Sequence, residues 1–452
     1  MGATSEDGEP LRKDDLLIPF REGAKPRERF RIGTEAEKFG VYLADGRPIP
    51  YGGPRGVLAV MRSLCERYGW VPESEREGGE VIALRRGDAS ITLEPGCQLE
   101  LSGAPQAAVH DTCAEFTGHL AELAQISAEL GIVWLGLGFH PFAARTDLDW
   151  VPKARYGVMR EYLPTRGAMA VDMMQRTCTV QANVDFTDEE DAVRKMRVSL
   201  AVSPIVTAMF ANSPFVEGER ARDLSVRARA WLFTDPDRCG ALPFVLEDGF
   251  GFERYVDWAL DVPMFLFKRG GRAIHNTGQT FRDFWMSGFE GHAASRDDWE
   301  SHLQTLFPEV RLKRTIELRG ADSVPTALLC ALPALWKGIL YDDDASDAAM
   351  KIAGDWTPQE RAALRREIPA LALGSTIRGT KLVDVACDLL DVAAEGLRRQ
   401  NLLSRRGRDE SAHLERLREM VEDGHCPAEL LAAEWDPHAP DPVPKLIALA
   451  KY

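Results

Sequence analysis

The sequence lacks the features that mark several large classes of protein. No run of lysines and arginines is longer than a short patch, and 70 acidic residues outnumber 55 basic ones, so the formal net charge is −15. Proteins that bind the phosphate backbone of DNA or RNA need a basic surface, so we expect no nucleic-acid partner. The longest apolar stretches, near 131–139 and 326–336, are too short to cross a membrane, so we expect no membrane association.

Cysteine is sparse, and its spacing shows no metal-binding pattern. The eight cysteines form no C-x-x-C pair, and no histidine lies at zinc-finger spacing from them. The opening residues, M-G-A-T-S-E-D-G-E-P, are polar and acidic, unlike a signal peptide or an arginine-rich transit peptide. We therefore expect mostly reduced thiols and a cytoplasmic location.

The familiar nucleotide-binding motifs are missing as well. Neither the P-loop pattern G-x-x-x-x-G-K-[ST] nor the protein kinase signature occurs, and Gly136-Leu137-Gly138 lacks the third glycine of a dinucleotide-binding turn. A nucleotide would therefore have to be held by a different arrangement of residues.

The chain is long enough for a large core, since 45% of its 452 residues are apolar. We expect a flexible tail over residues 1–15 and a single domain over 16–452, with a helical part from about 325 onward. Helical periodicity predicts long helices over 105–130 and from 187 to about 212. Alternating patterns predict strands over 28–43, 81–84, 89–94, 98–101, 132–139, 176–186 and 311–319. This combination predicts an α+β fold with an antiparallel sheet backed by helices.

Carboxylate and amide side chains recur on one face of the predicted strands. Side chains alternate along a strand, so Glu35 and Glu37 point to the same side. The later strands repeat this pattern with apolar residues opposite, and their polar faces carry Glu94, Gln98, Glu100, Thr177, Thr179, Gln181, Asn183, Asp185, Glu317 and Arg319. If the strands share one sheet, these side chains form a bowl of carboxylates edged by an arginine.

Two interpretations of this bowl compete. A solvated sheet face explains any single strand, and it is the better explanation for Glu35 and Glu37 alone. Recurrence on several strands, with apolar opposite faces, favours a metal site instead. Hard oxygen ligands suit Mg²⁺ or Mn²⁺, and two or three such ions would form a platform for the phosphates of a nucleotide triphosphate.

Long blocks of this sequence resemble glutamate–cysteine ligases of the plant and proteobacterial type. The blocks are R-I-G-T-E-A-E-K-F-G (31–40), S-I-T-L-E-P-G-C-Q-L-E-L-S-G-A-P (90–105), R-Y-G-V-M-R-E-Y-L-P (155–164), D-M-M-Q-R-T-C-T-V-Q-A-N-V-D-F (172–186), A-N-S-P-F-V-E-G (211–218), F-P-E-V-R-L-K-R (307–314) and R-G-A-D (319–322). Their order and length make the resemblance specific over residues 28–340.

The resemblance implies a fold and a reaction. The fold is glutamine-synthetase-like, with an antiparallel sheet forming an active-site funnel. The reaction joins L-glutamate to L-cysteine, with ATP as co-substrate and Mg²⁺ as cofactor, and yields γ-glutamylcysteine, ADP and phosphate through a γ-glutamyl phosphate. This is the first step of glutathione biosynthesis. The partners are then small molecules, and a monomer and a homodimer are equally tenable.

The resemblance also implies roles for individual residues. The implied metal ligands are Glu35, Glu37, Glu94, Glu100, Glu317 and, at the edge, Gln181. Arg319 is implied to face the transferring phosphoryl group or the cysteine, and it forms the catalytic set with Glu37 and Glu317. Arg227 is implied to clamp the α-carboxylate of glutamate, because an arginine fork suits a carboxylate. The other implied substrate-binding residues are Arg176, Thr177, Thr179, Asn183, Tyr156 and Arg160, of which the last two are equally explained as loop anchors.

Three alternatives stay open at this point. Cys113 and Cys330 match a cysteine pair of the family, and a disulfide between them is as tenable as two buried thiols. A related ligase that joins glutamate to another amine would carry the same carboxylates. A non-catalytic relative that binds a nucleotide or an amino acid would have lost some of them, whereas all those expected are present.

Overall fold

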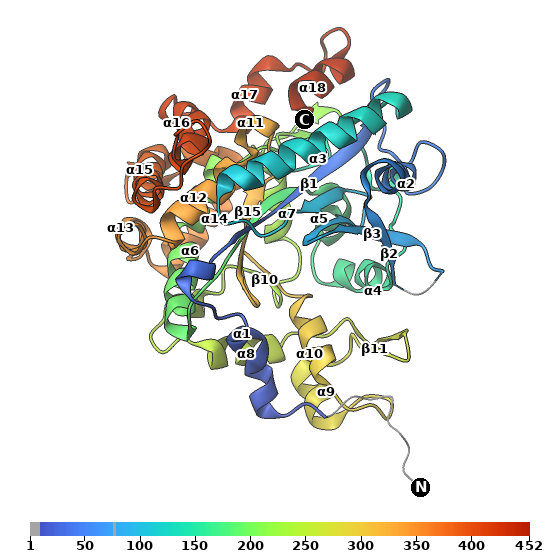
Figure 1. The fold of residues 1–452 in the computed structure, drawn as a ribbon, viewed down its shortest axis with the longest axis vertical. Helices are drawn as coiled ribbons and strands as arrows, with labels where there is room; N and C mark the ends of the chain where they lie inside the picture. Colours follow the sequence, from blue (N-terminus) through green and yellow to red (C-terminus); the bar gives the residue numbers. More distant parts are fainter. Residues whose placement is uncertain (1–9, 76–77) are drawn as a thin grey trace.

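A computed structural model describes residues 10–75 and 78–452 (Figure 1). Its main sheet has nine strands in the order β14-β15-β7-β1-β5-β4-β3-β2, with β6 pairing to a further part of β1, and each pairing is antiparallel. The strands are β1 (Ile32–Tyr42), β2 (Val71–Ser74), β3 (Val81–Arg86), β4 (Ala89–Leu93), β5 (Leu99–Ser102), β6 (Ile132–Leu135), β7 (Thr179–Val184), β14 (Val310–Leu312) and β15 (Ile316–Asp322). The predicted α+β fold with an antiparallel sheet is confirmed.

Helices surround this sheet, and α12, α13, α15 and α16 gather on one side of it in Figure 1. The helices are α1 (Ile18–Arg21), α2 (Val57–Tyr68), α3 (Val109–Leu130), α4 (Ala154–Tyr162), α5 (Ala170–Arg176), α6 (Glu189–Met209), α7 (Val226–Leu232), α8 (Phe252–Leu260), α9 (Phe281–Ser287), α10 (Arg296–Leu303), α11 (Thr326–Leu329), α12 (Ala331–Leu340), α13 (Asp343–Ala353), α14 (Pro358–Leu371), α15 (Leu382–Gln400), α16 (Glu415–Glu422), α17 (Pro427–Glu434) and α18 (Pro442–Ala450). Within the described ranges, no helix has both the length and the apolar character that a membrane crossing requires.

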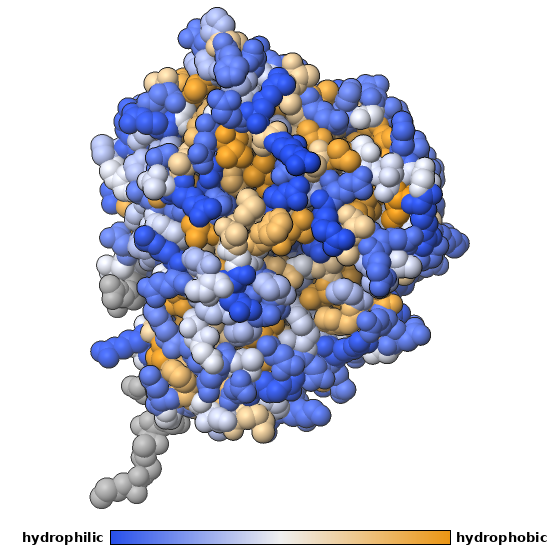
Figure 2. All heavy atoms as spheres, turned by 180° about the vertical axis from the view of Figure 1, so that it is seen from behind, coloured by the Kyte–Doolittle hydropathy of each residue, from blue (hydrophilic) through white to orange (hydrophobic). Residues whose placement is uncertain are grey.

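Short strand pairs complete the described part of the chain. They are β8 (Phe215–Val216) with β9 (Glu219–Arg220), β10 (Cys239–Gly240) with β13 (Phe307–Pro308), β11 (Leu266–Arg269) with β12 (Arg272–His275), and β16 (Thr376–Ile377) with β17 (Thr380–Lys381). On the face of the molecule in Figure 2, separate hydrophobic areas lie among hydrophilic side chains.

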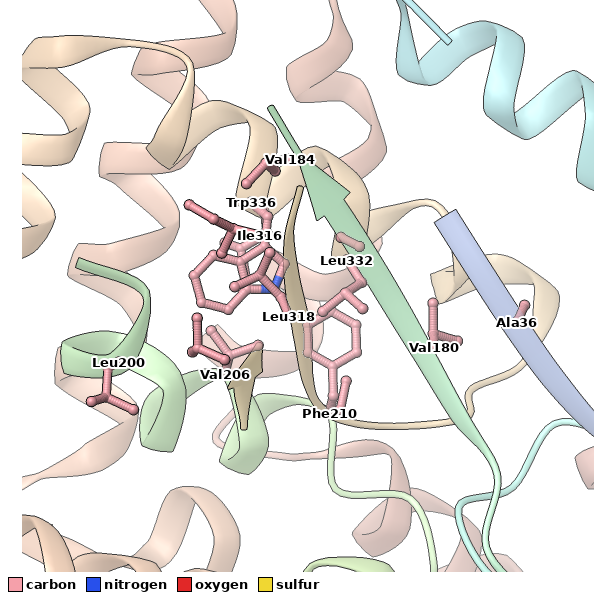
Figure 3. Close-up of a cluster of buried hydrophobic side chains, with 14 of the residues drawn as sticks. Ala36, Val180, Val184, Leu200, Val206, Phe210, Ile316, Leu318, Leu332 and Trp336 are labelled. Carbon is pink, nitrogen blue, oxygen red and sulfur yellow. The ribbon is translucent and has the colours of Figure 1, made fainter. Parts of the chain in front are cut away.

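One face of the main sheet is apolar, and helices cover it. Val180 and Ile316 of the strands are fully buried, and they lie with Phe210, Leu332 and Trp336 in one cluster (Figure 3). Each large apolar side chain removed from water contributes about 1.5–3 kcal/mol. Because strand side chains alternate, burying this set against the helices places the intervening polar residues on the opposite face.

Several predicted boundaries were wrong. The alternation over 311–319 predicted one strand, but the chain turns back at Lys313–Thr315, so that Arg311 of β14 lies opposite Glu317 of β15. The two arms of a tight hairpin can each keep the same alternation, so the pattern alone does not reveal the turn. The strand predicted over 176–186 begins at Thr179, because Arg176 still belongs to α5.

The N-terminal tail expected over residues 1–15 lies partly outside the described residues, which begin at residue 10. The described part is packed. Leu11 is buried, its N–H donates to the Ala294 carbonyl at 2.9 Å, and its carbonyl accepts from Trp285 Nε1 at 2.8 Å. Packing therefore starts before residue 16, and the extent of the domain stays a prediction.

A disulfide links the start of α3 to the junction of α11 and α12. Cys113 and Cys330 form this bond with their Cα atoms 5.9 Å apart, within the usual range. This pairing is the one of the two alternatives that the resemblance implied.

A buried ion pair holds three segments together near this disulfide. Lys337 of α12 lies 2.6 Å from the Glu410 carboxylate, with 3% and 0% of their side chains exposed. The same carboxylate accepts a hydrogen bond from the Val109 N–H at the start of α3, where a negative charge is favourable.

We expect Lys337→Met to lower the free energy of unfolding by about 3–5 kcal/mol, because Glu410 would keep a buried and unpaired charge. Denaturant unfolding of the ligand-free protein measures this loss. The matched control is Arg399→Met, which removes a partly exposed pair with Asp342 and should cost no more than about 1 kcal/mol. Equal losses in the two variants would contradict the prediction.

Candidate active site

The sheet brings the carboxylates together on the face opposite the apolar cluster. Glu37 of β1 lies directly opposite Glu100 of β5, and Glu35 lies opposite Gln181 of β7. One strand further, Glu317 of β15 lies opposite Asn183. Directly opposed side chains in an antiparallel pair are close neighbours, so the negative charges of Glu37 and Glu100 repel each other. The predicted bowl of carboxylates therefore exists as a geometric feature.

Burial makes this repulsion strong. Glu37 and Glu100 are each 8% exposed. Burial, followed by the neighbouring charges of Glu94 and Glu100, holds the pKa of Glu37 well above its usual range. Burial, with Glu35 and Glu94, raises the pKa of Glu100 to about 8. A group of buried carboxylates with raised pKa values is stabilised by a cation among them.

Hydrogen bonds fix the direction of these side chains. The Thr179 N–H donates to Glu37 Oε2 at 2.9 Å. The hydroxyls of Thr92 and Ser102 donate to Glu100 Oε1 at 3.1 and 2.8 Å. Thr179 and Thr92 lie on strands that neighbour the carboxylates they hold, and Ser102 lies on the same strand as Glu100, so the sheet itself orients the acidic groups.

Glu317 has the opposite electrostatic environment. It is fully buried, and its oxygens lie 2.6 Å from Arg311, 2.7 Å from Arg319 and 3.0 Å from Lys313. Burial raises its pKa, but the three cations outweigh burial and hold the pKa of Glu317 well below its usual range. Arg319 also donates to Gln181 Oε1 at 2.8 Å. Glu317 and Gln181 thus hold the guanidinium of Arg319 in place.

A cavity that is partly open to solvent lies beside the carboxylates. Its lining includes the predicted site residues Glu37, Glu94, Tyr156, Thr177, Thr179, Arg227 and Arg319. A second cavity shares Arg227, Trp231, Phe307 and Arg319 with it. The two cavities are therefore neighbouring parts of one hollow, in which arginines face carboxylates.

The position of Arg227 follows from a buried anchor at Asp322. This carboxylate accepts hydrogen bonds from Ser213 Oγ at 2.6 Å and from Ser225 Oγ at 2.9 Å, and Ser225 caps the N-terminus of α7. Arg227 follows in the first turn and donates to the Arg319 carbonyl at 2.8 Å. Its Nε is buried without a hydrogen-bond partner in the described structure, and a buried donor of this kind favours an acceptor from a ligand.

Three predicted substrate-binding residues do not line the cavity. The Arg176 guanidinium lies 3.2 Å from Asp172 and packs on Phe139. Arg160 stacks on Trp150 at 4.9 Å, and Asn183 donates to Glu35 Oε1 at 2.9 Å. The substrate-binding roles of Arg176, Arg160 and Asn183 stay predictions. Among the three, Arg176 has two buried guanidinium nitrogens, Nε and Nη2, without a hydrogen-bond partner in the described structure.

Several lining residues had no assigned role in the sequence analysis, among them Trp231, Arg155 and Phe307. Trp231 lies one helical turn after Arg227 on α7, so the i, i+4 spacing on one helix was the available signal. Arg155 directly precedes Tyr156 in the block that carried the resemblance, and it lines the same cavity. Phe307 packs edge-on against Trp231, with ring centroids 6.2 Å apart, and no sequence signal paired them.

The donor set at Glu37, Glu94 and Glu100 fits Mg²⁺. In the described ranges, no three acidic, histidine or cysteine side chains converge into a ready-made metal cage. Mg²⁺ does not need one, since it binds through one or two carboxylates and completes its shell with water and substrate phosphates. The repelling carboxylates beside an open cavity match this requirement.

Plant enzymes are similar to the chain over most of its length. The chain is 46% identical over 443 residues to chloroplastic glutamate–cysteine ligases of Brassica juncea and Arabidopsis thaliana, which covers 96% of the chain and 84% and 82% of those proteins. The crystal structure of a glutamate–cysteine ligase from Francisella tularensis in complex with AMP has a similar fold, with a TM-score of 0.56 at 12% identity. That match covers 93% of this chain and 87% of the other.

The expected cytoplasmic location is contradicted by these relatives. The Brassica and Arabidopsis enzymes, and a related enzyme from rice, are named as chloroplastic proteins. The acidic composition of the first residues was therefore not a sound basis for assigning a compartment.

The family model provides a separate comparison. The model of glutamate–cysteine ligase family 2 matches residues 31–442, which include every strand of the main sheet and each residue described above in the cavity. With this match and the 46% identity to the plant enzymes, the chain belongs to glutamate–cysteine ligase family 2.

Proposed function

We propose that this chain joins the γ-carboxylate of L-glutamate to the amine of L-cysteine. ATP is the co-substrate, the products are γ-glutamylcysteine, ADP and phosphate, and the reaction is the first step of glutathione biosynthesis. The observation that carries the proposal is the cavity in which Arg227 and Arg319 face Glu37 and Glu94 in a chain of this family.

The reaction has two chemical steps. The γ-phosphoryl group of ATP moves to the glutamate side-chain carboxylate and gives a γ-glutamyl phosphate. The amine of cysteine then attacks the acyl carbon, and phosphate leaves. Positioning and charge neutralisation supply most of the rate enhancement in such transfers.

Arg319 is the residue that we assign to the transferring phosphoryl group. Its guanidinium already binds Glu317 and Gln181, so it has little freedom left to lose when the substrates arrive. A preorganised positive charge of this kind stabilises the charge that develops in the transition state. Glu317 therefore contributes to catalysis by holding Arg319. In its predicted role as a metal ligand, a metal ion at Glu317 would have to compete with Arg311, Lys313 and Arg319 for the carboxylate.

Arg227 is the residue that we assign to a substrate α-carboxylate. Its guanidinium is 3% exposed, one nitrogen is bound to the Arg319 carbonyl, and Nε has no hydrogen-bond partner in the described structure. Arginine binds a carboxylate through two parallel hydrogen bonds, a geometry that lysine does not provide. Thr177, Thr179 and Tyr156 complete the wall around it.

Glu37, Glu94 and Glu100 would hold Mg²⁺, with Glu35 and Gln181 at the edge of the set, and two or three ions are part of the proposal. When bound, the metal would neutralise the phosphates of ATP. The contribution of the protein is to keep these carboxylates on one face of a rigid sheet. A ligase that uses another amine is the alternative, since it would keep the same acidic residues.

Phosphate release tests the substrates. With ATP and glutamate present, we expect cysteine to stimulate phosphate release strongly, because only an attacking amine completes the cycle. The control replaces cysteine with other amino acids at the same concentration. Turnover without cysteine, or equal rates with other amines, would exclude cysteine as the specific substrate.

We expect Glu37→Gln to lower kcat about 100-fold or more, because the variant loses a charge that holds the metal and phosphates in place. The measurement is steady-state kinetics over a range of Mg²⁺ concentrations, with circular dichroism to check folding. Glu129→Gln, which alters an exposed pair with Arg67, is the matched control and should behave like wild type. Normal activity of the Glu37 variant would remove this residue from the metal set.

We expect Arg227→Lys to raise the KM for glutamate about 10- to 100-fold, with a smaller effect on kcat, because lysine keeps the charge but loses the fork. Arg282→Lys is the control, since Arg282 pairs with exposed Asp257 and Asp261. Separate titrations of glutamate and cysteine identify the substrate involved. A rise in the KM for cysteine alone would move Arg227 to the other amino acid.

A further inference from the structure

Two strands diverge along one edge of β1 at Glu37, and we call this point the fork. Along one edge, β1 pairs with β7 over Ile32–Ala36 and then with β6 over Phe39–Tyr42. Along the other edge it pairs with β5, and beyond β5 the Ile49 N–H donates to the Gly40 carbonyl. Glu37 thus lies where β1 leaves one neighbour and has not yet met the next, so its main chain needs another source of support on that edge.

Ser323 provides this support. Its Oγ donates to the Glu37 carbonyl at 2.7 Å, and it is fully buried just after β15. Its Oγ also lies 3.0 Å from the hydroxyl of Tyr452. A serine hydroxyl has one proton, and Ser323 gives it to Glu37. Tyr452 must therefore donate to Ser323, which makes a directed chain from Tyr452 through Ser323 to Glu37.

Residues 450–452 lie next to β6, one of the two strands that diverge at the fork. The Gly136 N–H donates to the Ala450 carbonyl at 2.9 Å, and the Tyr452 N–H donates to the Trp134 carbonyl at 3.0 Å, so this segment runs beside β6. A Cβ on Gly136 would lie 2.7 Å from the Val324 carbonyl oxygen and 2.9 Å from the ring of Tyr452. The close approach of this main chain and this ring explains why a glycine stands at position 136.

Lys38 secures the other edge of β1 at the same level. It is 1% exposed, and its Nζ donates to the carbonyls of Ala36 and Leu99 at 3.1 and 3.4 Å. These two carbonyls belong to β1 and β5, the strands that carry Glu37 and Glu100 on the opposite face. The ammonium therefore holds together two strands whose carboxylates repel each other.

We propose that Tyr452 and Ser323 are positioning residues for the reaction, which fix Glu37 from the rear face of the sheet. Neither hydroxyl lines the cavity, so both act through the main chain of Glu37. Repulsion from Glu94 and Glu100 pushes the Glu37 carboxylate away from its neighbours, and a supported carbonyl resists that displacement. This inference rests on the proposed function, in which Glu37 holds the metal and phosphates.

Tyr452→Phe tests the chain because it removes one oxygen and keeps the ring. Its matched control is Tyr51→Phe, which removes a hydroxyl that donates to the Val81 carbonyl at 2.8 Å, away from the cavity. We expect similar small drops in the unfolding midpoint for both variants. Only Tyr452→Phe should lower kcat, by about tenfold, and raise the Mg²⁺ concentration needed for half-maximal activity, since small misplacement of a reacting group is costly.

Ser323→Ala and the double variant with Tyr452→Phe provide an independent test. If the two hydroxyls act as one chain, the double variant should have the same kcat as Ser323→Ala alone. Multiplied effects, or Tyr452→Phe kinetics equal to those of Tyr51→Phe, would overturn the inference. Failure of the proposed function is a separate result, because wild-type protein would then show no cysteine-dependent phosphate release.

Discussion

Repulsion among buried carboxylates is the constraint on which the rest of this structure depends. Glu37 and Glu100 lie directly opposite each other on the neighbouring strands β1 and β5, with Glu94 close by. Burial strengthens every charge interaction among them. Such a group persists only if the backbone that carries it is rigid. The wide antiparallel sheet supplies this rigidity, and the helices behind it supply the free energy that keeps the sheet folded.

The two faces of the sheet divide these tasks. The apolar face packs against α6 and α12, and its burial stabilises the folded protein. The polar face lowers the free energy of unfolding, because it buries acidic side chains that lack a compensating charge. The same division explains Glu317, which has the burial of its neighbours but three cations around it. Within one face, then, some carboxylates orient arginines and others are left for a ligand.

The supports of the site come from segments far apart in the chain. Asp322 anchors the start of α7 and thereby places Arg227, and Ser323, the next residue, binds the Glu37 carbonyl. The last residue of β15 therefore places an arginine, and the residue that follows it supports a carboxylate. Arg227 and Glu37 are both supported by residues 322 and 323, and this shared support keeps the distance and orientation between them fixed.

The sequence alone determined the α+β class and the acidic face with Arg319, because period-two alternation fixes which side chains share a face. Arg227 and Tyr156 of the cavity wall were indicated only through the resemblance. Tertiary structure decided the rest. The pairing of Trp231 with Phe307 and the contact of Ser323 with Glu37 join distant segments. The hairpin between Arg311 and Glu317 and the ion pair of Arg176 with Asp172 are short-range, but alternation along the chain does not reveal them. Alternation is a local property of the chain, whereas the partner of a side chain is set by packing over the whole molecule.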